Sequence, residues 1–167
     1  MTINGSNRYA ILRYHEVGLK GKNRSYFINH IVKNVRRVTR DLEVEKVWEE
    51  HGLIGVQLNE SANWDLIYDA LSKVFGIVKI SLANRGSRNL EQLKTDILEV
   101  IANKEFESFR ITTKRADKQF PLTSQEVNTE LGKFIQEETG AAVSLKTPSL
   151  TIYVDILART TYFYFDP

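Results

Sequence analysis

The residues best suited to a chemical task lie between Thr113 and Ser124, where three cationic side chains precede the expected start of a helix. The cations are Lys114, Arg115 and Lys118. Lysine and arginine bind phosphate oxygens through charge-assisted hydrogen bonds, and the amides at a helix N-terminus attract the same anions. The segment therefore predicts a phosphate-binding surface, in which Ser124 and the first helix amides take one further phosphate.

Two uncharged side chains of the same loop are suited to contact a nucleic-acid base. Single-stranded RNA is read by stacking of unpaired bases on aromatic rings and by hydrogen bonds to base edges. Phe120 is a candidate for stacking, and Gln119 is a candidate hydrogen-bond partner. An aromatic residue directly before Pro121 and a capped helix is often part of a core, and for Phe120 burial is slightly favoured over stacking.

Catalytic and metal sites find little support in the sequence. The three histidines are scattered, and none is paired with carboxylates at metal-ligand spacing. The absence of cysteine excludes disulfides, thiolate metal sites and a cysteine nucleophile. We therefore expect no catalytic residue, no metal and no cofactor in these 167 residues.

The Lys20-Gly21-Lys22 segment resembles a phosphate loop only superficially, because the G-x-x-x-x-G-K-[ST] pattern is missing. We expect Lys20, Lys22, Asn23 and Arg24 to form a basic shoulder that follows an RNA backbone or docks on another domain. Residues 1–40 carry nine lysines and arginines against one acid, although the whole chain has a net charge of only +2. Such a basic segment attracts polyanions, and the alternative is a helix kept soluble by its charge.

The first half of the chain alternates strand-like and helix-like periodicity. Apolar residues from Phe27 to Val38 recur at helical spacing, with Asn23 as the expected N-cap. His51-Gly52 joins two strand-like runs, because glycine permits a tight hairpin. The expected elements are a strand over 8–15, that helix, strands over 43–50 and 53–59, a helix carrying residues 64 to 74, and a strand over 78–82. This βαββαβ order is typical of a ferredoxin-like sandwich.

A turn-forming cluster at 84–88 is expected to separate a second unit from the first, giving domains at 1–83 and 84–167. Alternation over 109–114 predicts a half-buried strand that presents Arg110 and Lys114 on its polar face. Thr123 and Glu126 match a capping box, which predicts a helix ending at Gly140. A hairpin turning at 158–159 is expected to close the chain. Lys146 either borders an RNA groove or belongs to a simple edge turn.

Bulk properties fit a globular protein. Of the residues, 42% are hydrophobic and 26% are charged, so disorder is not expected. No apolar run is long enough to span a membrane, and the first residues lack the layout of a secretion signal. We therefore expect a cytoplasmic location and no membrane partner.

Three segments together resemble the N-terminal half of tRNA 4-thiouridine synthase, the ThiI family of tRNA sulfurtransferases linked to thiamine biosynthesis. They are EVGLKGKNR at 16–24 followed by Phe27, FGI at 75–77, and KRADKQF at 114–120 followed by Asn128, Glu130, Leu131 and Gly132. The first is similar to a signature of that family's ferredoxin-like domain, although His15 stands where the family usually has glycine. The third resembles the THUMP domain, an RNA-binding module.

The resemblance implies an α+β chain, with an N-terminal ferredoxin-like sandwich followed by an α/β THUMP domain. It implies that the THUMP domain holds the tRNA acceptor stem and its 3′ CCA end, which positions a uridine for thiolation. The family's catalytic pyrophosphatase-loop domain, where ATP and Mg²⁺ are expected, has a Ser-Gly-Gly-x-Asp-Ser loop that these residues lack. The sequence is then a piece of a longer enzyme or a stand-alone relative, and a homodimer would form through that other domain.

Two functions of other classes compete with this interpretation. One is a stand-alone RNA-binding, assembly or regulatory domain without thiolation, since ferredoxin-like sandwiches serve many purposes. The other is a complete small enzyme, against which the missing nucleophiles and metal ligands argue. Steep loss of affinity with salt would indicate phosphate contacts rather than an apolar protein interface.

Overall fold

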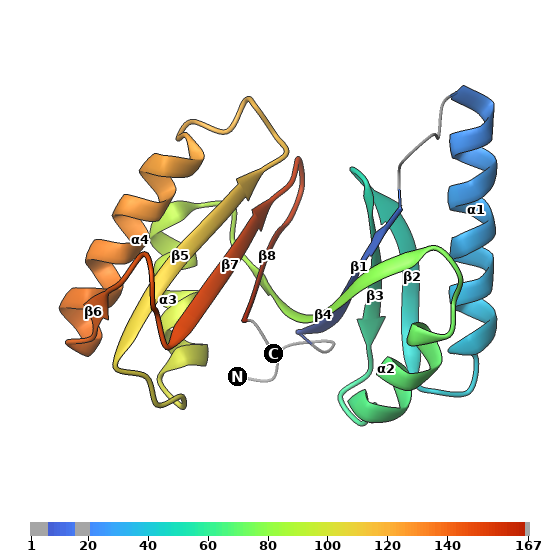
Figure 1. Cartoon of the computed structure of the whole chain (residues 1–167), viewed down its shortest axis with the longest axis horizontal. Coiled ribbons are helices and arrows are strands. Elements are labelled where there is room, and N and C mark those ends of the chain that lie inside the picture. Colours follow the sequence, from blue (N-terminus) through green and yellow to red (C-terminus); the bar gives the residue numbers. More distant parts are fainter. Residues whose placement is uncertain (1–6, 16–20, 166–167) are drawn as a thin grey trace. The chain divides into compact units, whose positions relative to one another are not determined.

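The computed structural model describes residues 7–15 and 21–165, which divide into two compact units, 1–83 and 84–167 (Figure 1). We call them the N-terminal and the C-terminal unit and describe each by itself.

The N-terminal unit has the element order βαββαβ, which confirms the ferredoxin-like prediction. Its strands follow the order β2-β3-β1-β4, and β3 is antiparallel to both β1 and β2. The elements are β1 (Arg8–Tyr14), α1 (Gly21–Val38), β2 (Val44–Glu50), β3 (Leu53–Leu58), α2 (Trp64–Ser72) and β4 (Ile77–Gly86).

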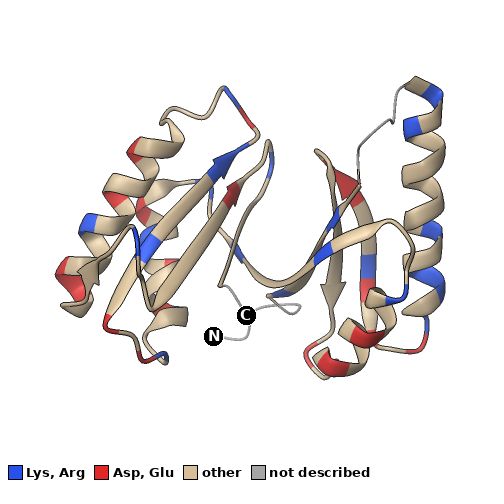
Figure 2. Ribbon diagram, viewed as in Figure 1, with Lys and Arg blue, Asp and Glu red and all other residues tan. Residues whose placement is uncertain are grey.

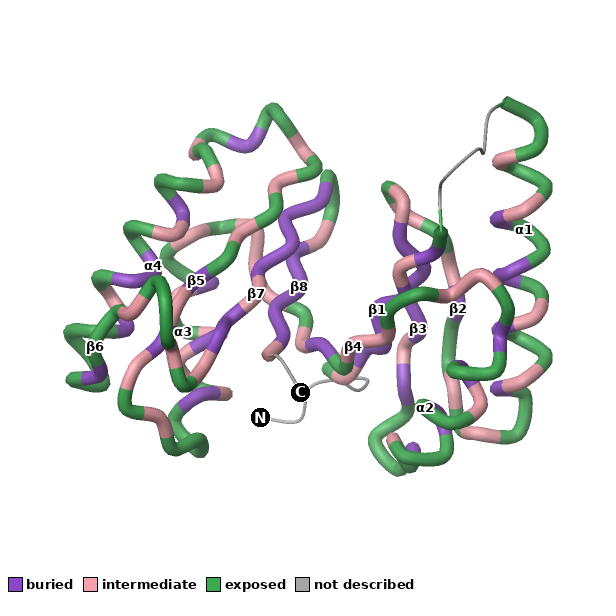
Figure 3. The backbone as a smooth tube through the Cα atoms, in the orientation of Figure 1, coloured by how far each residue is buried: buried purple, intermediate pink, exposed green. Residues whose placement is uncertain are grey.

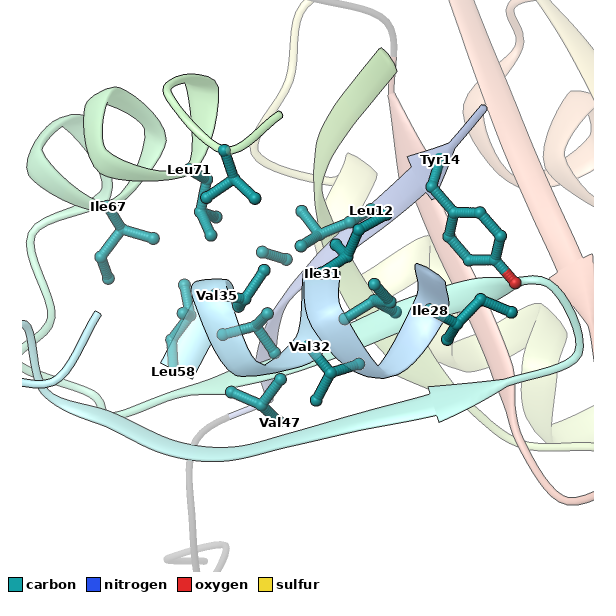
Figure 4. Packing of buried hydrophobic residues seen from close by; sticks show 14 of the residues in the cluster. Leu12, Tyr14, Ile28, Ile31, Val32, Val35, Val47, Leu58, Ile67 and Leu71 are labelled. Atoms are coloured by element: carbon teal, nitrogen blue, oxygen red, sulfur yellow. The ribbon is translucent and has the colours of Figure 1, made fainter. Parts of the chain in front are cut away.

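The core of this unit forms where the two helices meet the sheet. The buried face of α1 consists of Ile28, Ile31, Val32 and Val35, as the helical spacing predicted. Figure 4 shows these side chains beside Leu12 and Leu58 of the sheet and Ile67 and Leu71 of α2. Asn63 caps α2, because its side chain accepts hydrogen bonds from the amides of Asp65 and Leu66.

Two local predictions are wrong, one at the start of α1 and one at the boundary between the two units. Asn23 is not an N-cap, because α1 begins at Gly21 and Asn23 lies within its first turn. The cluster at 84–88 is not simply a turn, because β4 continues through Gly86. The hairpin at His51-Gly52 is confirmed, and φ values of 45° and 81° suit the type I′ turn that matches the strand twist.

The C-terminal unit is an α/β layer structure, as the resemblance implied. Its strands follow the order β8-β7-β5-β6. Strand β5 runs parallel to both β6 and β7, and β7 and β8 form the predicted hairpin. The elements are α3 (Leu90–Ile101), β5 (Ser108–Arg115), α4 (Ser124–Thr139), β6 (Ala142–Val143), β7 (Leu150–Ile156) and β8 (Thr161–Phe165).

Helices α3 and α4 pack with the sheet around a second core. The alternation predicted for β5 is present, with Phe109 and Ile111 buried in that core and Thr112 and Lys114 exposed. Purple segments in Figure 3 mark the buried residues along β7 and β8 of the same sheet. The capping box of Thr123 and Glu126 forms at the start of α4, and Gly140 ends the helix with a φ of 75°. These features fix the loop between β5 and α4 at both of its ends.

Candidate nucleic-acid interface

The loop between β5 and α4 is ordered by a hydrogen-bonded turn centred on Asp117. Its side chain accepts a hydrogen bond from the Gln119 amide at 3.0 Å, and its carbonyl accepts one from the Phe120 amide at 3.2 Å. The amide of Ala116 donates to the Ile156 carbonyl at 2.9 Å, which ties the loop to β7. Aspartate favours such turns because its short side chain bonds to the backbone two residues on.

Arg88 binds this loop from the segment before α3. Its Nη2 pairs with the second oxygen of Asp117, and its Nε donates to the Leu157 carbonyl at 2.9 Å. The guanidinium also lies 5.6 Å from the centre of the Phe120 ring. One planar cation therefore connects the loop, the β7–β8 hairpin and the core, which matches the fork geometry of arginine.

Arg115 positions the loop as well. Its Nη1 donates to the carbonyls of Lys118 and Phe120, both at 3.2 Å, and the residue is half-buried. The sequence predicts Arg115 as a phosphate contact. In the structure its Nη1 is already hydrogen-bonded to the loop backbone, so this nitrogen is not available to a phosphate.

The neighbouring lysines are placed differently. Lys114 and Lys118 are exposed, and neither forms an ion pair with any described residue. Gln119 is exposed beside them. Figure 2 shows blue at the end of β5 and in the loop that follows, where lysines and arginines lie. The loop thus holds two lysines toward solvent on a fixed backbone.

Phe120 is a core residue in this structure, which contradicts the stacking prediction. Its side chain is only 6% exposed and packs within the hydrophobic cluster of the C-terminal unit. A base cannot stack on a ring that is covered in this way. The slightly favoured alternative, burial next to a capped helix, is the one that the structure shows.

The N-terminus of α4 is a weaker anion site than its sequence indicated. The Thr123 hydroxyl accepts a hydrogen bond from the Glu126 amide at 3.1 Å, and the Glu126 carboxylate in turn contacts Thr123. The capping box thereby satisfies part of the helix end and adds a negative charge. The amides of Ser124 and Gln125 remain as donors for an anion.

A groove of about 680 Å³ lies along β5, α4 and β6. It is lined by Arg110, Ile111, Thr112, Gln125, Asn128, Thr129, Gly132, Val143, Leu145 and Tyr153. Arg110 is half-buried, and its Nη1 donates to the Leu145 carbonyl at 3.1 Å. Lys146 follows Leu145 in an exposed turn, so Arg110 holds the turn that carries the second cation of this region.

The predicted site residues of the N-terminal unit lie at the start of α1. Lys22 and Asn23 are exposed in its first turns, and Arg24 donates to the Tyr14 hydroxyl at 3.4 Å. Lys20 lies outside the described residues.

Of the residues that line the groove, only Arg110 was a predicted site residue; among those not predicted are Asn128, Gly132 and Tyr153, and Arg88 was not predicted for the loop. Asn128 and Gly132 are four positions apart, a spacing that places both on one face of a helix. That spacing was a usable signal. The sequence carries no local signal for Arg88 or Tyr153, because their partners lie far along the chain.

Within the described ranges, no group of three or more histidine or acidic residues is arranged to hold a metal ion. Among the same residues, no helix combines the length and apolar character needed to cross a bilayer.

Comparisons with known proteins agree with the division into an N-terminal and a C-terminal unit. Residues 9–81 match the ThiI ferredoxin-like domain, and residues 87–166 match the THUMP domain. The chain is 35% identical over 165 residues to a probable tRNA sulfurtransferase of Natranaerobius thermophilus, covering 93% of this chain and 40% of that protein. The chain therefore spans about 40% of the length of such relatives.

Two solved structures share the fold. A 4-thiouridine synthetase crystallised with RNA and ATP has a TM-score of 0.77 and 28% identity, and the match covers 96% of this chain and 41% of that one. A protein of Pyrococcus horikoshii Ot3 has a TM-score of 0.81 and 30% identity, with 95% and 54% covered.

Proposed function

The chain consists of a ThiI ferredoxin-like domain followed by a THUMP domain, and from this premise we propose that it is the tRNA-binding module of a 4-thiouridine-forming system. The module holds tRNA, and the thiolation itself takes place on a separate catalytic domain. ATP and Mg²⁺ belong to that domain in this proposal, and these residues need no cofactor.

The observation that carries the proposal is the ordered loop with two exposed lysines. Arg88, Asp117 and Arg115 fix the backbone, while Lys114 and Lys118 face solvent without ion pairs among the described residues. Binding to a fixed backbone avoids the entropy cost of ordering a loop around each phosphate. The arrangement suits a polyanion with a defined path better than a general attraction to charge.

We propose that the bound part of tRNA is the acceptor stem with its single-stranded 3′ CCA end. The C-terminal unit offers cations to RNA at both ends of β5, with Lys114 and Lys118 at one end and Arg110 and Lys146 at the other. Four residues at about 3.3 Å each separate Arg110 from Lys114, so the two groups are roughly 13 Å apart along the strand. This distance suits several nucleotides rather than one phosphate.

The test is a binding titration of tRNA at several salt concentrations. Lys114→Ala combined with Lys118→Ala should lower the affinity and flatten the salt slope by about two units, roughly one per lost phosphate contact. The matched control is Lys73→Ala with Lys104→Ala, which removes the same charge elsewhere and should change the slope little. Equal slopes for both pairs would contradict the proposed surface.

A second titration tests the part of tRNA that is bound. Removing the 3′ CCA should weaken binding more than trimming the anticodon arm. Equal losses would mean that the protein attracts RNA backbone without recognising the end.

A further inference from the structure

We propose that the groove between β5 and α4 takes one unstacked base of the RNA, an assignment that rests on the function proposed above. The lysines of the loop account for phosphate contacts, but they cannot distinguish one nucleotide from another. The groove supplies the missing kinds of contact, namely unpaired backbone groups, unpaired side-chain atoms and aromatic and apolar walls.

The first kind of contact is an open strand edge. Strand β6 pairs only with Ser108 and Phe109, and β5 continues to Arg115. The Phe109 carbonyl accepts a hydrogen bond from Ser144 on the β6 side. In a strand every second residue directs its backbone polar groups to the same side, so Ile111 and Thr113 point to the same edge beyond the end of β6.

Backbone groups at such an edge are strong donors and acceptors that need partners. Ile111 lines the groove, so its part of the edge forms a wall of this space. A nucleobase carries donors and acceptors side by side on its own edge, which is the pattern that a strand edge presents.

The second kind of contact is a pair of buried polar atoms. Arg110 Nε and Asn128 Oδ1 have no hydrogen-bond partner within the described structure, and both residues line the groove. One atom is a donor and the other is an acceptor. Buried polar groups in native proteins are nearly always paired, and an exception calls for an absent partner. A base offers an acceptor to the first atom and a donor to the second.

The third kind of contact is the wall of the groove. Tyr153 stacks on Tyr164 with ring centres 5.2 Å apart and planes at 14°, and Tyr153 lines the groove. Val143 and Leu145 add apolar surface and are 43% and 70% exposed. Gly132 leaves room beside them, since an added Cβ would meet only Val143 Cγ2, at 3.9 Å.

This combination favours a base over a phosphate group. Phosphate is bound by several cations at once, whereas the groove has one arginine, which already donates to the Leu145 carbonyl. Aromatic and apolar walls suit the flat face of a base. A base released from its stack in a single-stranded RNA end fits these walls and the open edge together.

The experiment uses the whole chain and an acceptor-stem RNA with an unpaired 3′ end. Each unpaired nucleotide is replaced in turn by an abasic one, and affinity is measured by fluorescence anisotropy. For the natural chain, one abasic position should cost roughly five- to a hundredfold in affinity, the range for loss of a stacked base.

The protein variants are Asn128→Ala, which removes the unpaired oxygen, and Gly132→Leu, which fills the groove. Each variant should bind the intact RNA more weakly. In each, the abasic replacement that lowers the affinity of the natural chain should cause almost no further loss. Gly132→Ala serves as the control for the helix, and circular dichroism verifies the fold of every variant. A variant that fails to fold leaves the other variant and the abasic series to decide.

The base proposal is overturned if the abasic series looks the same in the natural chain and in the folded groove variants. A peptide strand on the β5 edge would produce that result, because removing bases would not affect it. The two proposals fail in different ways. If the Lys114 and Lys118 pair also has no effect, the RNA-binding function is wrong. If that pair weakens binding and the groove variants leave the abasic pattern unchanged, only the base assignment is wrong.

Discussion

The two units of the molecule differ in how much positive charge they carry and in where it lies. The N-terminal unit, 1–83, carries twelve lysines and arginines against nine acids, and nine of the twelve lie within residues 1–40, whereas residues 84–167 carry eleven against twelve acids. In the N-terminal unit Lys33 and Arg37 project from the exposed face of α1, while Arg36 of the same helix binds the Val47 carbonyl. In the C-terminal unit Arg88, Arg110 and Arg115 bind backbone carbonyls.

Net charge and site organisation are therefore separate properties of the two units. A basic helix raises the local concentration of RNA at long range, an effect that salt screens. A nearly neutral unit becomes selective when its arginines fix the backbone and leave a few cations in defined places. We therefore expect the N-terminal unit to contribute attraction and the C-terminal unit to contribute recognition.

The largest effect should come from Gly76→Ala in the N-terminal unit. Gly76 has a φ of 97°, and an added Cβ would lie 2.9 Å from Phe27 Cζ and 3.0 Å from Ile31 Cδ1. Strain and overpacking together should lower the free energy of unfolding by about 3 kcal/mol. Both tryptophans, Trp48 and Trp64, lie in this unit, so tryptophan fluorescence during urea unfolding reports its stability.

RNA binding in the same variant separates the contributions of the two units. At a urea concentration that unfolds only the variant's N-terminal unit, affinity should fall through loss of attraction but keep its dependence on the 3′ end. Loss of end recognition would mean that recognition does not reside in the C-terminal unit.

Arg88→Ala should have the next largest effect and lower the free energy of unfolding by about 2 kcal/mol. The Asp117 carboxylate and the Leu157 carbonyl, both part-buried, would lose the hydrogen-bond donor that now satisfies them. RNA affinity should also fall severalfold, since the loop loses its order. Thermal unfolding and anisotropy measure the two quantities. Arg88→Lys should not restore them, because lysine lacks the two-pronged geometry.

Arg37→Ala is the matched control for this change, with an expected effect on unfolding below about 0.5 kcal/mol. If Arg88→Ala leaves RNA affinity intact, preordering of the loop has no part in binding.

Gly132→Ala should stabilise the protein by about 0.5–1 kcal/mol, the opposite sign to Gly76→Ala. Gly132 lies inside α4, where alanine is the better helix former, and the nearest atom to the new Cβ is at 3.9 Å. Chemical denaturation followed by circular dichroism measures the change. A destabilised variant would show that the groove is narrower than the structure indicates.

The smallest effect should come from Lys33→Ala with Arg37→Ala on α1. The double variant loses two exposed cations. Because we expect neither cation to make a fixed phosphate contact, the salt slope of tRNA binding should change by less than about one unit. A change as large as that of the Lys114 and Lys118 pair would break the comparison, since recognition would then extend over the basic helix.

Much of the fold was predictable because each element has a clear period. The apolar spacing of α1, the alternation in β5 and the capping box of α4 gave the element order and the fold class of both units. The two-residue strand β6 was missed, because two residues carry no period.

The site was predictable only in part. The basic loop was found by composition, but composition does not say which cation faces solvent. That depends on where the carbonyls of Lys118 and Phe120 lie, and Arg115 reaches both of them. The link from Arg88 to Asp117 spans 29 positions and has no local pattern. The RNA contacts of the site residues stay a prediction in both units.

The short length of β6 also bears on how the protein remains dispersed. A strand edge without a neighbour is a template for pairing with another chain, and proteins guard such edges with charge. Arg110 and Lys114 stand on the strand whose edge is open, so each copy repels the same strand of another copy. RNA that occupies the groove would cover this edge, and a preparation stripped of nucleic acid should therefore aggregate more readily at high salt.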